Sequence, residues 1–358
     1  MQGFANAVLI LLIAGIGECA QAQDRAVAVS ENALRMQLDR IIPELMARYQ
    51  VPGVAIAIVD AGGPVHLVGY GFTNAIDSVR VQDSTIFEGA SLGKPLFAYA
   101  LLHEVTEHPL DLNRRVAEYL GAPIVAGSAG ATITARQLLS HSSGLAFSAG
   151  EGGRYLAFPP GSRWQYSGLG FGVLQQVAEK YYEASLEQMV RRTVTAPLHM
   201  KSTSYLPPEK TTGRAAGHDR QGRQLPGTDW GSPSAASSLH TSARDYGRFL
   251  SAMLSGLYSM NDSCTARMVE KQIEADKSRG LSWGLGWAIA EEGSDRFFLH
   301  WGSNPGYKSL ALGSLRVGRA MVVLTNGDNG LEIATALVPV VFGHHYAFLD
   351  FTMLHPDD

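Results

Sequence analysis

The stretch Phe87-Glu88-Gly89-Ala90-Ser91-Leu92-Gly93-Lys94-Pro95 contains one serine and two patterns that describe serine nucleophiles. Gly89 to Gly93 matches G-x-S-x-G, in which the serine occupies a sharp turn between a strand and a helix. Ser91 to Lys94 matches S-x-x-K, in which a lysine one helical turn after the serine acts as its partner. The two patterns belong to different folds, so the rest of the sequence has to decide between them.

The composition is that of an ordinary globular protein. The chain has 358 residues, of which 46% are hydrophobic and 17% are charged. This length is enough for one large domain or for two intertwined ones. The formal net charge of −4 argues against a nucleic acid or an anionic membrane surface as the partner.

The first 22 residues predict a secretory signal peptide. The apolar run from Ala5 to Ile16 is too short to span a bilayer comfortably, and Ala20-Gln21-Ala22 is a small-x-small cleavage site followed by polar residues. We therefore expect cleavage after Ala22, a secreted or periplasmic location and no stable membrane span afterwards; the alternative is a hydrophobic N-terminal anchor. Cleavage would also remove Cys19, and Cys264 alone cannot close an internal disulfide.

The hydrophobic pattern predicts strands at both ends of the chain and helices between them. Runs rich in Val and Ile on either side of Gly62-Gly63 predict an antiparallel hairpin, and strand character returns late in the sequence, at 51–60, 64–72, 282–290, 296–300, 308–315 and 319–325. Helical spacing or capping signals occur at 30–49, 91–105, 134–139, from 185, from 241 or 242 to near 256, and at 331–348.

The short connections between the strands favour antiparallel pairing. The predicted fold class is therefore α+β, with an antiparallel sheet flanked by helices and an inserted, mostly helical region. We expect a sheet domain formed by residues 23–95 and 240–358, a helical domain formed by residues 96–239, and an active site in the cleft between them.

This arrangement argues against the G-x-S-x-G interpretation. That motif requires a parallel βα sheet, with an acidic residue and then a histidine after the serine and the histidine beyond the last strand. Residues 85–88 could form the preceding strand and His300 could be the base. However, two predicted strands follow His300, and the C-terminal half lacks alternating βαβ units. A chance match to so short a motif is also unsurprising in a chain with 39 glycines.

The S-x-x-K interpretation makes a chemical demand on Lys94. A helix that begins at Ser91 places both side chains on one face. Lys94 can act as a base only when it is neutral, so its surroundings must lower its pKa through desolvation or nearby positive potential. Ser91 could then attack an acyl group and form a covalent acyl-enzyme. The motif alone is common and equally fits a capped helix with a solvated lysine.

Two later segments resemble motifs of one family. Residues 160–168 contain Tyr166-Ser167-Gly168, and residues 298–306 contain His300-Trp301-Gly302. They resemble the second and third motifs of the serine β-lactamase and penicillin-binding protein superfamily, in its class C and esterase-like branch. There the second motif is Tyr-x-Asn or a variant, and the third is Lys-Thr-Gly or His-x-Gly. Segments 138–145, 235–249 and 284–287 also resemble family segments in the expected order, so the resemblance covers roughly residues 30–345.

The resemblance implies a role for each site residue. Ser91 is the nucleophile and Lys94 is its paired base. Tyr166, as phenolate or through a proton shared with Lys94, activates Ser91 and later the deacylating water. His300 orients the substrate or polarises the proton network, and the backbone N–H groups of Ser91 and Ser303 form the oxyanion hole. The positions expected to contact the substrate are Gly168, Trp301 and Gly302.

Other histidines are given no chemical role. His141 lies in a family segment that we interpret as structural, and a plain histidine at the end of a strand is the alternative for His300 as well. His344 and His345 have no acidic or cysteine partner at metal-ligand spacing nearby. We therefore expect neither a metal nor a cofactor.

Two departures from the family pattern bear on the substrate. Gly168 replaces the asparagine that contacts the amide side chain of a β-lactam, and His300 replaces a fixed cation that pairs with a substrate carboxylate. Both favour small esters or amides, as in a carboxylesterase. The alternatives are a true class C-like β-lactamase, a D-amino-acid-specific peptidase, and a penicillin-binding sensor or scaffold without turnover. The acyl group, the leaving group and the oligomeric state stay open.

Overall fold

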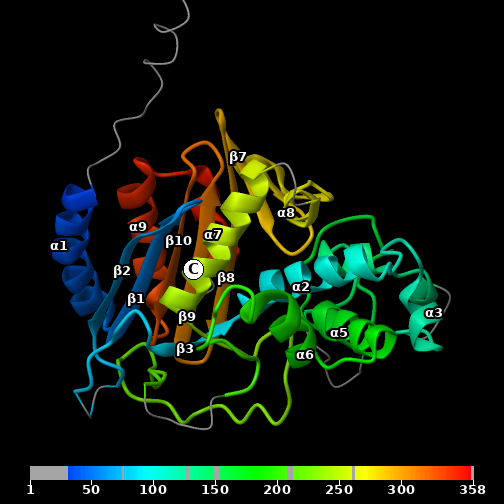
Figure 1. Cartoon of the computed structure of the whole chain (residues 1–358), viewed down its shortest axis with the longest axis horizontal. Helices are drawn as coiled ribbons and strands as arrows, with labels where there is room; N and C mark the ends of the chain where they lie inside the picture. The colour runs from blue at the N-terminus through cyan, green and yellow to red at the C-terminus, as the bar shows by residue number, and fades with distance from the viewer. Residues whose placement is uncertain are drawn as a thin grey trace, which may run out of the picture.

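The structure is a computed structural model that describes residues 31–355, apart from 75, 77, 126–128, 148–153, 208–212 and 260–262 (Figure 1). The expected signal peptide and its cleavage site after Ala22 therefore lie outside the described residues. Within the described ranges, no helix combines the length and the apolar character needed to cross a membrane.

One antiparallel sheet forms the centre of the molecule. In the part of the chain that the structure describes it has eight strands, in the order β2-β1-β10-β9-β8-β7-β6-β5. Their bounds are β1 Gly53–Asp60, β2 Gly63–Gly71, β5 Ile273–Asp276, β6 Leu281–Trp283, β7 Ala288–Glu292, β8 Asp295–Asn304, β9 Tyr307–Ser314 and β10 Arg319–Thr325. Because β1 pairs with β10, the N-terminal hairpin extends the C-terminal strands into one sheet. This confirms the predicted α+β class.

Strand β1 shows how the sheet separates two apolar cores. Successive side chains in a strand point to opposite faces. One face of β1 joins the core on the side of α7 (Ala243–Ser259), through Ala55, Ala57 and Val59. The other face joins the core on the side of α1 (Glu31–Tyr49) and α9 (Gly330–Phe342), through Val54, Ile56 and Ile58. Burial on both faces explains why this strand reads as an unbroken apolar run.

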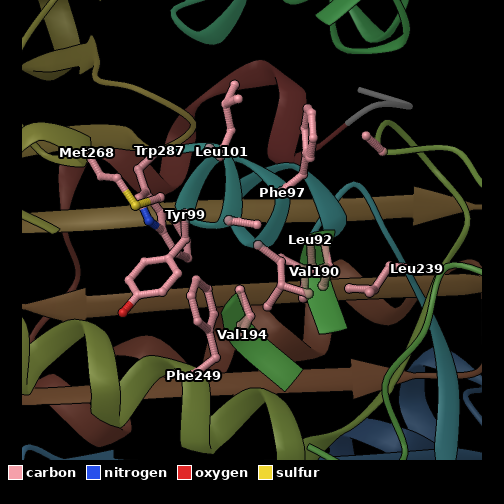
Figure 2. Close-up of a cluster of buried hydrophobic side chains, with 14 of the residues drawn as sticks. Leu92, Phe97, Tyr99, Leu101, Val190, Val194, Leu239, Phe249, Met268 and Trp287 are labelled. Atoms are coloured by element: carbon pink, nitrogen blue, oxygen red, sulfur yellow. The ribbon is translucent and has the colours of Figure 1, made fainter. Parts of the chain in front are cut away.

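The helical region lies beside the sheet, to the right in Figure 1. It contains α2 Gly93–Glu107, α3 Val116–Leu120, α4 Ala135–Leu139, α5 Gly168–Tyr182 and α6 Leu186–Val190, while α8 (Ser263–Met268) packs on α2 and α7. The α6 helix begins at the predicted Ser185 capping box. Most of α2 is buried on all sides, and Figure 2 shows Phe97 and Leu101 of this helix among buried side chains of other elements, such as Phe249 and Trp287. Position 94 on this helix is therefore inside the protein.

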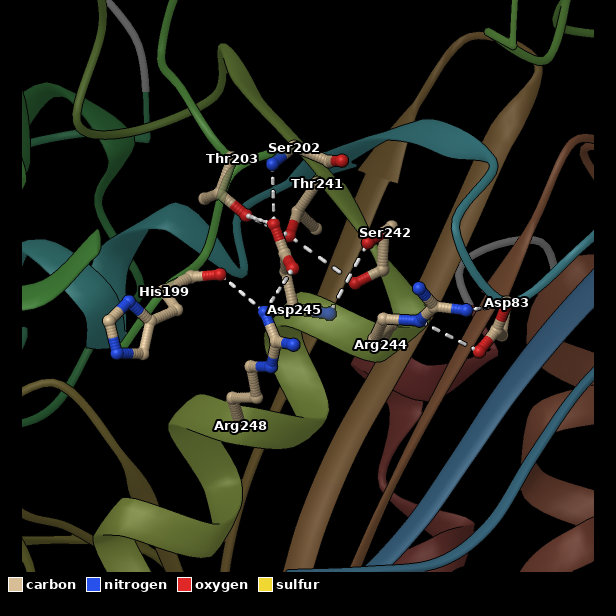
Figure 3. A network of polar contacts seen from close by, with 9 residues as sticks. All are labelled: Asp83, His199, Ser202, Thr203, Thr241, Ser242, Arg244, Asp245 and Arg248. Carbon is tan, nitrogen blue, oxygen red and sulfur yellow. Dashed lines mark hydrogen bonds and ion pairs between the residues drawn. The ribbon is translucent and has the colours of Figure 1, made fainter. Parts of the chain in front are cut away.

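A polar network joins the helical region to α7 (Figure 3). The carboxylate of Asp245, near the start of α7, accepts hydrogen bonds from the Ser202 backbone N–H at 2.6 Å and the Thr203 hydroxyl at 3.2 Å. Burial raises the pKa of Asp245. The adjacent Arg244 binds both oxygens of Asp83 at 2.9 Å. These contacts hold the chain before and after the helical region in one arrangement.

Four predicted boundaries are wrong. The strand expected at 296–300 continues to Asn304 as β8. The run at 282–290 is two strands, because residues 284–287 form a bend between β6 and β7. The last helix ends at Phe342 instead of continuing to 348, since Gly343 adopts a left-handed conformation with φ of 100° and stops it. Conversely, α7 continues through Gly256 to Ser259.

Candidate active site

Ser91 lies in a turn between a short strand and a helix. Strand β3 (Ile86–Ala90) ends at Ala90, which adopts a left-handed φ of 49°, and α2 begins at Gly93. This local geometry fits either serine motif. However, among the described residues β3 pairs with β4 (Leu239–Ser242) in a separate antiparallel ladder. The sheet context that the G-x-S-x-G interpretation requires is therefore missing from the described chain.

The glycine after Ser91 has a packing role. A Cβ atom on Gly93 would lie 2.8 Å from the ring of Tyr205, closer than side-chain carbons approach. The hydroxyl of Tyr205 also donates a hydrogen bond to the Gly93 carbonyl. Gly93 therefore allows the start of α2 to pack closely against Tyr205.

The side chains of Ser91 and Lys94 form a hydrogen-bonded pair. The Lys94 Nζ atom lies 2.8 Å from Ser91 Oγ and 2.5 Å from the carbonyl oxygen of Ala236, and Ser91 Oγ lies 3.2 Å from the same carbonyl. The Lys94 side chain is 1% exposed. Burial lowers the pKa of Lys94 to about 7, because the charged form loses its hydration. A large share of Lys94 is then neutral at physiological pH and able to accept the Ser91 proton.

The Ala236 carbonyl is held in place by a buried network. Asn304, at the end of β8, donates from its side chain to the Ser237 carbonyl at 3.1 Å and to Glu88 Oε2 at 2.8 Å. The other carboxylate oxygen of Glu88 lies 3.2 Å from Arg214. Asn304, Glu88 and Arg214 thus anchor the residue next to Ala236, whose carbonyl is the acceptor of Lys94.

Tyr166 stands over the pair and is buried. Its ring centroid is 5.0 Å from Lys94 Nζ, and Phe147 and Trp301 stack on it at 6.0 and 5.8 Å. Burial raises the pKa of Tyr166 far above that of a free phenol, and the nearby Ser91 hydroxyl only partly opposes this. Burial therefore favours a neutral phenol at Tyr166 over a standing phenolate.

His141 holds both neighbours of Tyr166. Its carbonyl accepts the Gln165 N–H at 2.8 Å, and its ring Nδ1 accepts the Ser167 N–H at 3.0 Å. The ring centroids of His141 and Tyr166 also lie 4.3 Å apart. His141 adopts a left-handed φ of 53°, and burial, Lys94 and His300 keep its pKa well below the usual value. His141 therefore has a structural role, as expected, and this role is to hold the backbone on both sides of Tyr166.

His300 is a neutral group in this structure. It is fully buried in β8, and its Nδ1 lies 2.7 Å from the Trp301 carbonyl. Because a carbonyl only accepts hydrogen bonds, Nδ1 carries the proton and Nε2 is left as an acceptor; Nε2 has no partner among the described residues. Burial and the charge of Lys94 lower the pKa of His300 to about 3. It supplies no cation for a substrate carboxylate.

A cavity of about 410 Å³ opens onto these residues. It is lined by Ser91, Phe147, Tyr166, Trp301, Ser303, Thr352 and Met353. The cavity thus brings together the predicted nucleophile, the tyrosine and both ends of the predicted oxyanion hole. Phe147, Thr352 and Met353 were not predicted, since no motif contains them.

The other two predicted substrate contacts lie outside this lining. Gly168 begins α5, where a Cβ atom would meet the Phe147 carbonyl at 3.4 Å. At Gly302 a Cβ atom would lie 2.3 Å from the Gly89 carbonyl, so this glycine allows β8 to approach β3, the strand that ends just before Ser91. Their contact with substrate stays a prediction.

A second, larger cavity lies away from this chemistry. It measures about 590 Å³ and is lined by residues of β1, β2 and α7, including Arg244, Arg248, Ser251 and Ser255. Both arginines bind carboxylates and both serines donate to backbone carbonyls. Nothing there resembles a nucleophile and its base. Over the described ranges, no group of three His, Cys, Asp or Glu residues could hold a metal ion.

Comparison with known proteins places these features in context. The Beta-lactamase family model matches residues 38–342. Protein flp of Staphylococcus aureus is 23% identical over 330 residues, covering 82% of this chain; the match spans 64% of flp, less than two thirds of its length. A Beta-lactamase of Psychrobacter immobilis is 24% identical over 301 residues, covering 80% of this chain and 72% of that protein.

Solved structures show the same fold. The octameric penicillin-binding protein homologue from Pyrococcus abyssi gives a TM-score of 0.77 at 22% identity, covering 90% of this chain and 80% of that one. The D-alanine carboxypeptidase AmpC from Burkholderia cenocepacia gives 0.75 at 20%, covering 87% and 99%. EstCE1, described as a hydrolase with promiscuous acyltransferase activity, gives 0.74 at 18%, covering 84% and 95%.

Proposed function

The chain belongs to the Beta-lactamase family, and we propose that it is a serine hydrolase that cleaves esters or amides through an acyl-enzyme on Ser91. The observation that carries this proposal is the buried contact of 2.8 Å between Ser91 Oγ and Lys94 Nζ beside an accessible cavity. A nucleophile within hydrogen-bond reach of a base with a lowered pKa is the arrangement needed for covalent acyl transfer. We place this site between the sheet domain (23–95 and 240–358) and the helical domain (96–239).

The first half of the reaction follows from these positions. Neutral Lys94 takes the proton of Ser91 while Oγ attacks the carbonyl carbon of the substrate. The developing oxyanion accepts hydrogen bonds from the backbone N–H groups of Ser91 and Ser303, the largest electrostatic contribution in acyl transfer. As the bond to the leaving group breaks, the proton passes from Lys94 to the leaving oxygen or nitrogen, with the neutral phenol of Tyr166 as relay.

The second half repeats the same steps with water. A water molecule gives a proton to the Lys94–Tyr166 pair and attacks the ester that Ser91 carries. Collapse of the second tetrahedral intermediate releases the acid and returns the proton to Ser91. In this proposal His300, neutral and with its Nε2 without a partner among the described residues, orients the polar hydrogens of this network.

Esters are favoured over β-lactams by the electrostatics of the site. Gly168 offers no side-chain amide, and the low pKa of His300 leaves it uncharged. A substrate carboxylate would therefore lack a cationic partner at His300, whereas amides and esters without a carboxylate need no such partner. The proposal includes export of the protein and removal of residues 1–22, which the N-terminal sequence supports.

Two chromogenic substrates test the proposal. We expect purified protein to hydrolyse a short-chain nitrophenyl ester, and Ser91→Ala to abolish this activity. Turnover of a chromogenic cephalosporin at a higher kcat/KM than the ester would instead indicate a β-lactamase. A lasting covalent adduct without turnover of either substrate would indicate a sensor or scaffold and would contradict the hydrolase proposal.

A further inference from the structure

The segment after α9 folds back to the active site. Residues 346–355 are anchored in the core on the α1 and α9 side of the sheet, where Tyr346 and Phe348 contact Phe297 at 4.6 and 5.1 Å. Further on, Phe351 packs against Trp164 at 5.9 Å and Trp301 at 5.8 Å. These contacts fix the end of the segment beside Trp301, which stacks on Tyr166.

This anchoring places Thr352 and Met353 in the wall of the cavity that contains Ser91. The short helical turn Thr352–Leu354 is pinned by Leu354, which is fully buried, and by the His355 ring, which lies 2.8 Å from the Leu349 carbonyl. Met353 itself is only partly buried. The family match ends at residue 342, so this wall comes from a part of the chain beyond the matched region.

The described residues that line the cavity combine apolar surface with uncharged polar groups. Phe147, Trp301 and Met353 supply the apolar surface, and Phe147 is 60% exposed. The polar residues in the lining are Ser91, Tyr166, Ser303 and Thr352, and none of these side chains carries a formal charge. A charged group placed here would lose part of its hydration, and the described residues that line the cavity offer it no opposite charge.

We propose that Met353, held by the C-terminal segment, forms the end of a pocket for an apolar substrate group, and that the enzyme therefore prefers uncharged esters of medium chain length over short or carboxylate-bearing ones. This inference rests on the proposed function of Ser91. Methionine suits such a position because its flexible, polarisable side chain adapts to apolar ligands.

A series of nitrophenyl esters with acyl chains of two to twelve carbons tests the proposal. We expect kcat/KM to rise about fourfold for each methylene that packs in the pocket, then to fall once the chain reaches Met353. An ester of equal length with a terminal carboxylate should react at least tenfold more slowly. Met353→Ala should move the optimum to longer chains and Met353→Trp to shorter ones. Met36→Ala, on an exposed position of α1, is the matched control and should leave the optimum unchanged.

Labelling with alkyl fluorophosphonates of increasing chain length separates failure of this inference from failure of the proposed function. If Ser91 is labelled but all Met353 variants keep the wild-type chain-length profile, the inference is wrong and the proposed nucleophile stands. If no fluorophosphonate labels Ser91, the proposed function is wrong and the inference falls with it. A profile that shifts only in the Met353 variants supports both.

Discussion

Replacing Lys94 by Met tests the electrostatic basis of the site through the stability of the fold. Lys94 has a pKa of about 7 in the folded protein against 10.5 for a free lysine. The protonated side chain therefore destabilises the folded state by about 5 kcal/mol at pH 6 and below, since each pKa unit is worth about 1.4 kcal/mol. Met has a similar shape and no charge, so Lys94→Met removes this cost while abolishing the base.

The sign of the pH dependence follows from proton binding. Between pH 7 and 10.5 the unfolded wild-type chain holds a proton on Lys94 that the folded chain has released, so wild-type stability rises with pH in this window. The variant lacks this term. Its advantage over the wild type should therefore fall by about 3 kcal/mol between pH 6 and pH 9. Loss of the hydrogen bond to Ala236 offsets the absolute difference by about 1–3 kcal/mol and does not change the slope.

Urea unfolding at several pH values between 6 and 9 measures this difference. Lys201→Met, at an exposed lysine, serves as the control, because an exposed ammonium group keeps its water in both states. A stability difference between Lys94→Met and wild type that stayed constant from pH 6 to pH 9 would contradict the lowered pKa of Lys94. Lys94 would then keep an ordinary pKa and could not be the base.

Three further predictions concern the neighbours of the pair. Tyr166→Phe should lower kcat by about 10²–10⁴-fold, as expected for loss of a positioned proton donor, with an unchanged circular dichroism spectrum; near wild-type kcat would remove Tyr166 from the mechanism. His141→Ala should lower kcat more than His141→Asn, because Asn tolerates a positive φ and can accept the Ser167 N–H. Equal rates for the two variants in steady-state assays would contradict the role of His141 in holding the backbone beside Tyr166. Glu88→Ala should lower the free energy of unfolding by about 3–5 kcal/mol, because it leaves Arg214 without its buried partner; a loss below about 1 kcal/mol in urea unfolding would count against this.

The sheet and most helices were predictable because their signals are local. The unbroken apolar run of β1 and the capping box at Ser185 each specify an element without knowledge of the fold. Two of the boundary errors occurred where glycines interrupt a run with large apolar side chains. Residues 284–287 place Leu285 and Trp287 beside two glycines; Gly286 adopts a positive φ of 95°, and the Gly284 N–H bonds to the Trp287 carbonyl, which bends the chain there. Likewise, Gly343 was too weak a signal within an otherwise apolar C-terminal run.

The site was predictable only where a motif recorded it. Ser91, Lys94 and Tyr166 stand in motifs with fixed residue types, and the structure brings them together. The carbonyl of Ala236 could not be found in the same way, because any residue type supplies a backbone carbonyl. Met353 lies far along the chain from Ser91, and only the packing of the C-terminal aromatics brings it to the cavity.

The pH dependence of covalent labelling at Ser91 shows whether a neutral Lys94 activates this serine. A fluorophosphonate should add its mass to the peptide containing Ser91, and the rate constant for labelling should rise with pH and reach half its maximum near pH 7, as Lys94 loses its proton. Ser91→Ala should give no adduct. An adduct on another residue, or a rate that does not change between pH 5 and pH 9, would contradict the pairing of Ser91 with a neutral lysine base.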